Sequence, residues 1–263
     1  MKKRLLFSTA ILGIMLFPFM SCDKSDGNEN GDTPHESINL KSGLVLYYTF
    51  DEGTQNLSVQ TITDYSNSNV GGVINGSPSF VSDTPNGKGH AIRLGLDDYI
   101  NIPKFTVQGM LDVTINVWVK DFTRGWLIAS LKSNIITSPS IGINNSDLLL
   151  YLSRNSNITT AKNIFSKSFL GFQSNGWHMI TVTSEYVGST QSGAQGALES
   201  KNIASLYIDG VLIDSQRIWQ DKCAGESMII GPEAAPMTID NVRVYNRALD
   251  EGEVKELYNT ERR

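Results

Sequence analysis

Short apolar runs, separated by polar turn residues, follow one another from Gly43 almost to the C-terminus. The pattern is clearest at Val113–Lys120, where the odd positions are Val or Ile and the even positions are Thr, Asn, Trp and Lys. This two-residue period is typical of a strand with one buried and one polar face. Many such runs, bounded by Gly, Asn, Ser and Asp, predict an all-β sandwich or barrel.

Two other apolar runs and one long polar segment add detail to this pattern. Leu44–Phe50 is apolar at both parities, which predicts a central strand. Leu206–Ile213 contains Asp-Gly between two apolar pieces, which predicts a tight hairpin. Gly188–Asn202 is rich in Ser, Gly, Gln and Ala and has no hydrophobic period, so we expect a long loop there.

The closing stretch, Thr238–Tyr258, predicts a strand followed by a short helix. Asp250 with Glu253 three residues later has the spacing of a capping box at the start of that helix. Asp240 shares the parity of Val242 and Val244, so we expect its carboxylate to point into the buried face. A carboxylate in that place requires a cation or several hydrogen bonds.

The N-terminus has the features of an export signal. A basic start, Lys2-Lys3-Arg4, precedes an apolar run that is too short for a durable membrane span and ends at Ser21-Cys22. The small residue before Cys22 resembles the lipobox of bacterial lipoproteins, which implies lipidation of Cys22 and anchoring to a membrane without spanning it. An ordinary secretory signal cut near Ser21 is the alternative. We expect a signal peptide at 1–21, a flexible polar tether at 22–42 and one domain at 43–263.

Charge and cysteine content narrow the function classes. Removal of residues 1–21 takes away three basic and no acidic residues, and the formal charge moves from −5 to −8. A mildly acidic chain without a basic run argues against nucleic acid as a partner. With Cys22 lipidated, Cys223 is left alone and cannot form an internal disulfide.

The order of the β pieces resembles the laminin-G-like, concanavalin A-like jelly roll, over about residues 43–258. The resemblance implies two antiparallel sheets packed as a sandwich, with the short helix at the C-terminus. Members of this fold bind sugars, mediate adhesion or accompany glycosidases, so the fold alone does not name a ligand. The pieces that carry the resemblance are Leu46–Gly53, Asp98–Pro103, Val113–Lys120, Gly176–His178, Leu206–Gly210 and Ile239–Leu249.

The resemblance also implies a site for a structural calcium ion. Some members hold Ca²⁺ between the end of the first strand and the closing strand, which points to Asp240 and Asp51 with backbone carbonyls around them. The alternatives are a carboxylate of Asp240 that backbone N–H groups or an arginine satisfy, and an exposed turn position for Asp51.

Sugar binding on such a sandwich requires an exposed aromatic platform. Trp126 and Trp219 lie in polar, loop-like contexts, and Trp118 lies on the polar parity of its strand. These three are the candidate ligand-binding residues. The alternative for each is a ring that covers the edge of the core.

Nothing in the sequence marks a catalytic site. The Glu-x-Asp-x-x-Glu run of related sandwich glycosidases does not occur in the sequence. We therefore expect a non-catalytic, lipid-anchored module of the cell envelope, at the outer membrane and exposed on the surface, that binds a glycan or a surface protein. A glycoside hydrolase or lyase domain with an unfamiliar site, and a purely structural envelope subunit, are the alternatives.

Overall fold

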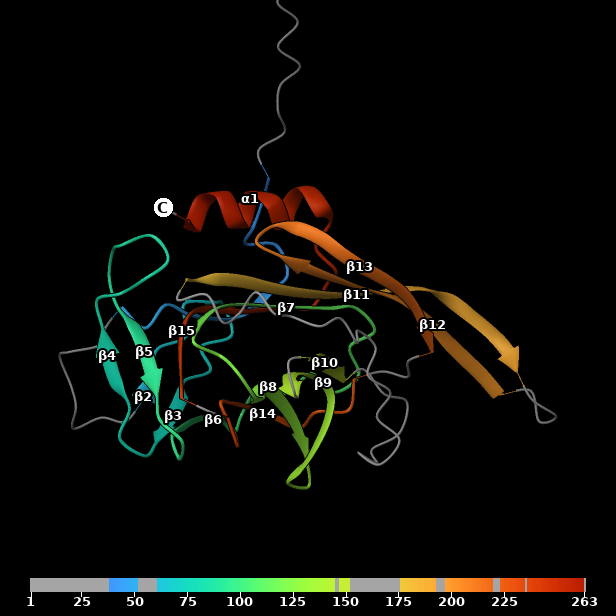
Figure 1. Cartoon of the computed structure of the whole chain (residues 1–263). Helices are drawn as coiled ribbons and strands as arrows, with labels where there is room; N and C mark the ends of the chain where they lie inside the picture. Colours follow the sequence, from blue (N-terminus) through green and yellow to red (C-terminus); the bar gives the residue numbers. More distant parts are fainter. Residues whose placement is uncertain are drawn as a thin grey trace, which may run out of the picture. The chain divides into compact units, whose positions relative to one another are not determined.

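The chain folds into two antiparallel sheets and one short helix, as a computed structural model shows (Figure 1). The model describes residues 38–51, 61–144, 147–151, 176–192, 197–219, 223–234 and 236–262. The expected signal peptide and most of the expected tether lie outside these residues. The prediction of an all-β sandwich with a C-terminal helix is confirmed.

The larger sheet contains the closing strand near its centre. The strand order is β13 (Val211–Trp219), β12 (Ala197–Ile208), β11 (His178–Ser192), β7 (Val113–Lys120), β15 (Met237–Tyr245), β5 (Ala91–Leu94) and β4 (Ser79–Val81), with β1 (Leu44–Tyr48) also paired to β15.

The second sheet packs against the inner face of the first. Its strand order is β10 (Asp147–Tyr151), β9 (Ile135–Asn144), β8 (Gly125–Lys132), β14 (Ser227–Ile230), β6 (Tyr99–Ile102), β3 (Gly72–Asn75) and β2 (Thr61–Ile62).

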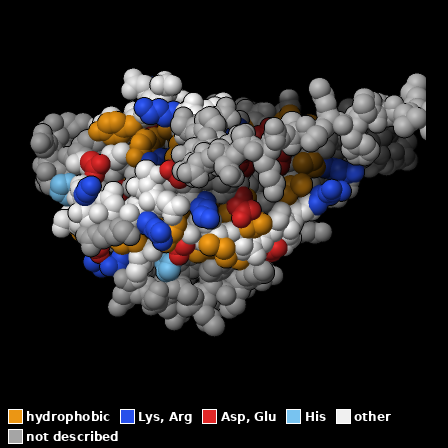
Figure 2. Space-filling view, turned by 90° about the horizontal axis from the view of Figure 1, so that it is seen from above, with side chains coloured by type: hydrophobic (Ala, Val, Ile, Leu, Met, Phe, Trp, Pro, Cys, Tyr) orange, Lys and Arg blue, Asp and Glu red, His pale blue; other side chains and the backbone are white. Residues whose placement is uncertain are grey.

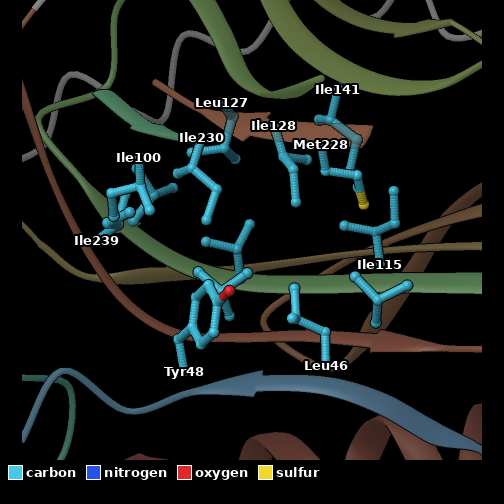
Figure 3. Packing of buried hydrophobic residues seen from close by; sticks show 14 of the residues in the cluster. Leu46, Tyr48, Ile100, Ile115, Leu127, Ile128, Ile141, Met228, Ile230 and Ile239 are labelled. Carbon is cyan, nitrogen blue, oxygen red and sulfur yellow. The ribbon is translucent and has the colours of Figure 1, made fainter. Parts of the chain in front are cut away.

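The main core lies between the two sheets. In Figure 3, Leu46, Tyr48 and Ile115 of the larger sheet face Ile128 and Met228 of the second sheet, and each is at most 1% exposed. Alternate residues of each strand fill this layer, which follows from the two-residue side-chain period. Hydrophobic burial of this kind is the dominant favourable term in folding.

The outer face of β7 in the larger sheet is also buried, which its alternation did not predict. Every residue of β7 except Lys120 is buried, because helix α1 (Glu251–Glu261) and the chain before it cover this face. The polar residues of the strand are hydrogen-bonded there. Thr114 Oγ1 donates to Arg247 O at 2.8 Å, and Asn116 Nδ2 donates to Thr181 Oγ1 at 2.7 Å. The outward-facing residues of β7 therefore belong to a second packed layer.

Helix α1 begins as its sequence predicts. The Asp250 side chain accepts the N–H of Glu253 at 2.8 Å, and the Glu253 carboxylate accepts the N–H of Asp250 at 3.0 Å. Leu249 before the cap and Val254 after it are both buried in the cluster beneath the helix. The capping box and the hydrophobic pair fix where the helix starts.

One expectation about a loop and one about a strand are wrong. The expected loop Gly188–Asn202 forms the far halves of β11 and β12, which pair from Gly188 opposite Lys201 to Ser192 opposite Ala197. In Figure 1 this hairpin arm extends past the neighbouring strands, and its sequence shows no hydrophobic period. Leu44–Phe50 was expected to be a central strand, but β1 ends at Tyr48 and pairs with β15 alone among the described strands.

The end of the expected tether is ordered. Residues 39–42 form a turn in which the N–H of Ser42 donates to Asn39 O at 3.2 Å, and Arg247 Nε donates to Ser42 O at 2.8 Å. Leu40 packs against the cluster beneath α1. The folded unit begins at Ile38.

Candidate functional site

Asp240 lies at a β-bulge, and the bulge reverses its expected orientation. Opposite β7, Asp240 pairs with Trp118 and Arg243 pairs with Asn116, so two residues of β15 stand opposite one of β7. Asn241, in the bulge, has a φ of +48°, which is a left-handed conformation that Asn tolerates. The side chain of Asp240 therefore lies on the outer face with Trp118, and the prediction of an inward carboxylate from parity alone is wrong.

The carboxyl of Asp240 is buried all the same. It is 3% exposed, and one of its oxygens accepts the N–H of Asn241 at 2.7 Å. Burial raises the pKa of Asp240 to about 8, with smaller contributions from the nearby Asp51 and Glu261, against the Asn241 hydrogen bond and Arg243. The group is therefore mostly protonated at neutral pH.

Asp51 approaches the same junction from the end of β1. It is exposed, and its carboxylate accepts the N–H of His90 at 3.0 Å. Gly89 has a φ of +70°, and a Cβ added to it would collide with Asp51 Oδ1, so glycine is required at this turn. The structure thus brings both predicted calcium ligands to one junction. Within the described residues, no group of three or more His, Cys, Asp and Glu side chains is placed to hold a metal.

Tyr47 connects the groups of this junction. Its hydroxyl donates to Asn241 Oδ1 at 3.1 Å, and the guanidinium carbon of Arg243 lies 3.8 Å from the centre of its ring. Burial is the largest of the effects that raise the pKa of Tyr47. The phenol is therefore a neutral hydrogen-bonding group held in one position.

Tyr65 is the exposed aromatic residue next to Tyr47. Its side chain is 52% exposed, and the two rings meet edge to face with centres 6.4 Å apart. Neither tyrosine was predicted from the sequence, because Tyr65 lies in a polar turn with no strand period and Tyr47 lies within an apolar run. The sequence Asp64-Tyr65-Ser66 marks a turn and not a platform.

Trp118 does not form an exposed platform. It is 2% exposed, its ring stacks on Tyr258 of α1 with centres 5.5 Å apart, and its Nε1 donates to Glu261 Oε2 at 2.8 Å. Glu261 also pairs with Arg243, and both are buried. We call Trp118, Arg243, Tyr258 and Glu261 the helix-docking network, because they hold α1 on the sheet. The sugar-platform prediction for Trp118 is wrong because α1 covers its strand.

The other two candidate tryptophans, Trp126 and Trp219, lie on other strands than Trp118. Trp126 is half-buried in β8 of the second sheet, and its ring lies against Gly142 of β9, where an added Cβ would come within 2.9 Å. Trp219 is the last residue of β13, opposite Lys201, and its side chain lies outside the described part of the structure. The three predicted residues therefore do not form one platform, and a ligand-binding role for Trp126 and Trp219 stays a prediction.

Several solved structures have a similar fold. The binding domain of Paraclostridial Mosquitocidal Protein 1 is 21% identical, with a TM-score of 0.60, over 84% of this chain and 53% of that one. The binding domain of botulinum neurotoxin DC in complex with rat synaptotagmin II is 19% identical, with a TM-score of 0.59, over 84% and 52%. A third structure comes from a study of botulinum neurotoxin type C, whose cell entry depends on interaction with two ganglioside molecules. It is 19% identical, with a TM-score of 0.60, over 84% of this chain and 52% of that one. At these identities the likeness shows the fold, and the chain spans about half of each structure.

One curated relative matches part of the sequence. The transcriptional regulatory protein CiaR of Streptococcus pneumoniae is 26% identical over 136 residues, which are 48% of this chain and 60% of that protein. The chain spans less than two thirds of that regulator, and we draw no functional argument from it.

A family model matches more than half of the chain and agrees with the two-sheet architecture. The model describes the concanavalin A-like lectin/glucanases superfamily, in its laminin G form, and it matches residues 94–255. These residues run from the end of β5 into α1 and include the closing strand. The chain belongs to the concanavalin A-like lectin/glucanases superfamily.

Proposed function

We propose that the chain is a non-catalytic binding module of the cell envelope, anchored by a lipid, that binds carbohydrate or a surface glycoconjugate or protein. The observation that carries this proposal is the fold likeness to receptor-binding domains over 84% of the chain. One of those domains was solved with synaptotagmin II, and another study concerns gangliosides. Superfamily membership supports the same class of function, although a fold by itself does not fix a ligand.

The charges on the surface above α1 argue against nucleic acid as the ligand. Among the described residues, Figure 2 shows basic and acidic side chains interspersed on this face, without one large basic patch. A basic patch is the usual electrostatic mark of a nucleic-acid-binding surface. The net charge of −5 agrees with this choice of partner.

The test of binding is a glycan array and a pull-down from surface-protein extracts with the same chain. We expect saturable binding in one of the two screens. Absence of a ligand in both screens contradicts the proposal. Turnover of a polysaccharide, abolished by one carboxylate substitution, instead supports the hydrolase or lyase alternative.

The proposed anchor is the lipidated Cys22, at an outer-membrane and surface-exposed location. No helix in the described part of the chain is long and apolar enough to cross a membrane. A Cys22→Ser variant should lose metabolic labelling with a palmitate analogue and leave the membrane fraction, because the acyl chains are removed. Cys223→Ser is the matched control, and it should keep both the label and the membrane association.

The proposed calcium site is the junction of Asp240 and Asp51. Ca²⁺ takes six to eight oxygen ligands, so backbone carbonyls would have to complete the set. Calcium should raise the unfolding temperature of the wild-type chain relative to EDTA and leave that of Asp240→Asn unchanged, because binding to the folded state stabilises it. Equal unfolding temperatures of the wild type with calcium and with EDTA contradict the site.

A further inference from the structure

Tyr65 presents an aromatic face from a turn that is held in place by its neighbours. The carboxylate of Asp64 accepts the N–H groups of Tyr47 at 2.9 Å, Ser66 at 2.8 Å and Val70 at 2.9 Å. The N–H of Tyr65 itself donates to Tyr47 O at 2.8 Å. A ring that is fixed before binding loses little conformational entropy when a ligand stacks on it.

Hydrogen-bonding groups lie on the Tyr47 side of this ring. The hydroxyl of Tyr47 donates to Asn241, so its oxygen keeps lone pairs that can accept a further hydrogen bond. Asp51 is exposed and close enough to Tyr47 to affect the pKa of its phenol. We call Tyr47, Asp51, Tyr65 and Asn241 the tyrosine seam.

The tyrosine seam offers no free positive charge to an acidic ligand. The guanidinium of Arg243 lies against the Tyr47 ring, and Glu261 neutralises it. Asp240 is 3% exposed and does not present its carboxyl to solvent at the seam. Asp51 therefore contributes the negative charge at the seam, and it disfavours carboxylated or sulfated sugars.

An exposed aromatic ring beside fixed hydroxyl, amide and carboxylate groups can contact both the apolar face and the hydroxyl groups of a pyranose. The C–H face of the sugar packs on an aromatic ring, and its hydroxyls bond to the polar groups around that ring. We propose that the tyrosine seam binds a neutral saccharide, with Tyr65 as the stacking residue and Asp51 as an acceptor for sugar hydroxyls. This inference rests on the proposed function, since it gives a place and a ligand class to carbohydrate binding.

The test is a glycan array with neutral and sialylated oligosaccharides, followed by affinity measurement for the best binder. Tyr65→Ala should weaken binding about tenfold or more, because it removes the stacking face. Tyr65→Phe should stay within about threefold of the wild type, since it keeps the ring. Tyr99→Ala is the matched control, a partly exposed tyrosine of β6 in the other sheet, and it should bind as the wild type does.

Each other outcome contradicts a defined part of the account. Binding of a glycan that Tyr65→Ala leaves unchanged overturns the tyrosine seam while carbohydrate binding stands. Preference for sialylated over neutral glycans overturns the ligand class. Failure of the wild type to bind any glycan overturns the seam together with the carbohydrate part of the proposed function. Because Tyr65 is half exposed, its variants should keep the wild-type unfolding temperature, which confirms that they are folded.

Discussion

The closing strand carries charged residues that are buried on its outer side. Asp240 is 3% exposed, and Arg243 and Glu261 are each 7% exposed. Their electrostatic environments differ, because Arg243 and Glu261 neutralise one another while the carboxyl of Asp240 accepts a hydrogen bond from Asn241 N–H. Burying a carboxylate without a paired cation favours its protonated form.

The first prediction concerns the pH dependence that Asp240 adds to stability. Its folded-state pKa of about 8 lies above the ordinary value of 3.8, so the folded chain holds the proton more tightly. Its contribution to the free energy of unfolding is therefore complete below about pH 4 and is lost as the pH rises towards 8, by up to about 1.4 kcal/mol per pH unit. Asp240→Asn should remove this decline, because an amide does not ionise.

Urea unfolding between pH 5 and pH 9 measures this effect. The advantage of Asp240→Asn over the wild type should grow with pH. Glu226→Gln is the control, since Glu226 is exposed and its substitution should leave the profile unchanged. A wild-type profile parallel to that of Asp240→Asn would show that Asp240 ionises normally.

The second prediction concerns the ion pair of the helix-docking network. Glu261→Ala leaves Arg243 buried without its carboxylate and removes the acceptor of Trp118 Nε1. Breaking a buried pair in this way costs about 3–5 kcal/mol. Asp83→Ala is the comparison, because it removes the exposed partner of Lys120 and should cost at most about 1 kcal/mol. Equal losses in urea unfolding contradict the role given to Glu261.

At this scale the sequence predicted residue types better than orientations. Asp240 was expected to need a cation or several hydrogen bonds and accepts one from Asn241 N–H, and a one-residue bulge moved it to the other face. Trp118 has the parity of an outer residue, and the sequence does not reveal that α1 covers it. Tyr65 was missed because exposure in a turn leaves no periodic signal.

At the scale of elements, the sequence correctly predicted the features that depend on interactions between residues close in sequence. The capping box of α1 and the Asp-Gly hairpin between β12 and β13 are both present. The hairpin arm was predicted as a loop, because its sequence has no hydrophobic period. Its pairing depends on backbone hydrogen bonds between β11 and β12, which composition does not reveal.

The third prediction concerns this arm. Residues 189–200 pair only with one another among the described strands, so replacing them by Asn-Gly between Gly188 and Lys201 should leave the sandwich intact. The free energy of unfolding should change by less than about 1 kcal/mol, because the described strand pairing of this segment is with itself and not with the other strands of the sandwich. Circular dichroism and urea unfolding check this expectation. A chain that fails to fold would show that the arm belongs to the folding core.

At the scale of the whole molecule, the order of weak strand signals was enough to identify the sandwich. Alternating hydrophobicity gives the inward faces, and the two sheets close over them as expected. Which strands pair across long sequence distances, such as β1 with β15, is not encoded in any local pattern. The same limit applies to the tyrosine seam, because its residues come from three segments far apart in the sequence.

The central proposal for the whole molecule is that it binds carbohydrate without chemical change. Equilibrium dialysis of the chain against its best array glycan, with mass spectrometry of the recovered glycan, measures both parts at once. The account predicts saturable binding and complete recovery of intact glycan. Cleaved or eliminated glycan, or no difference in glycan concentration across the membrane, would contradict it.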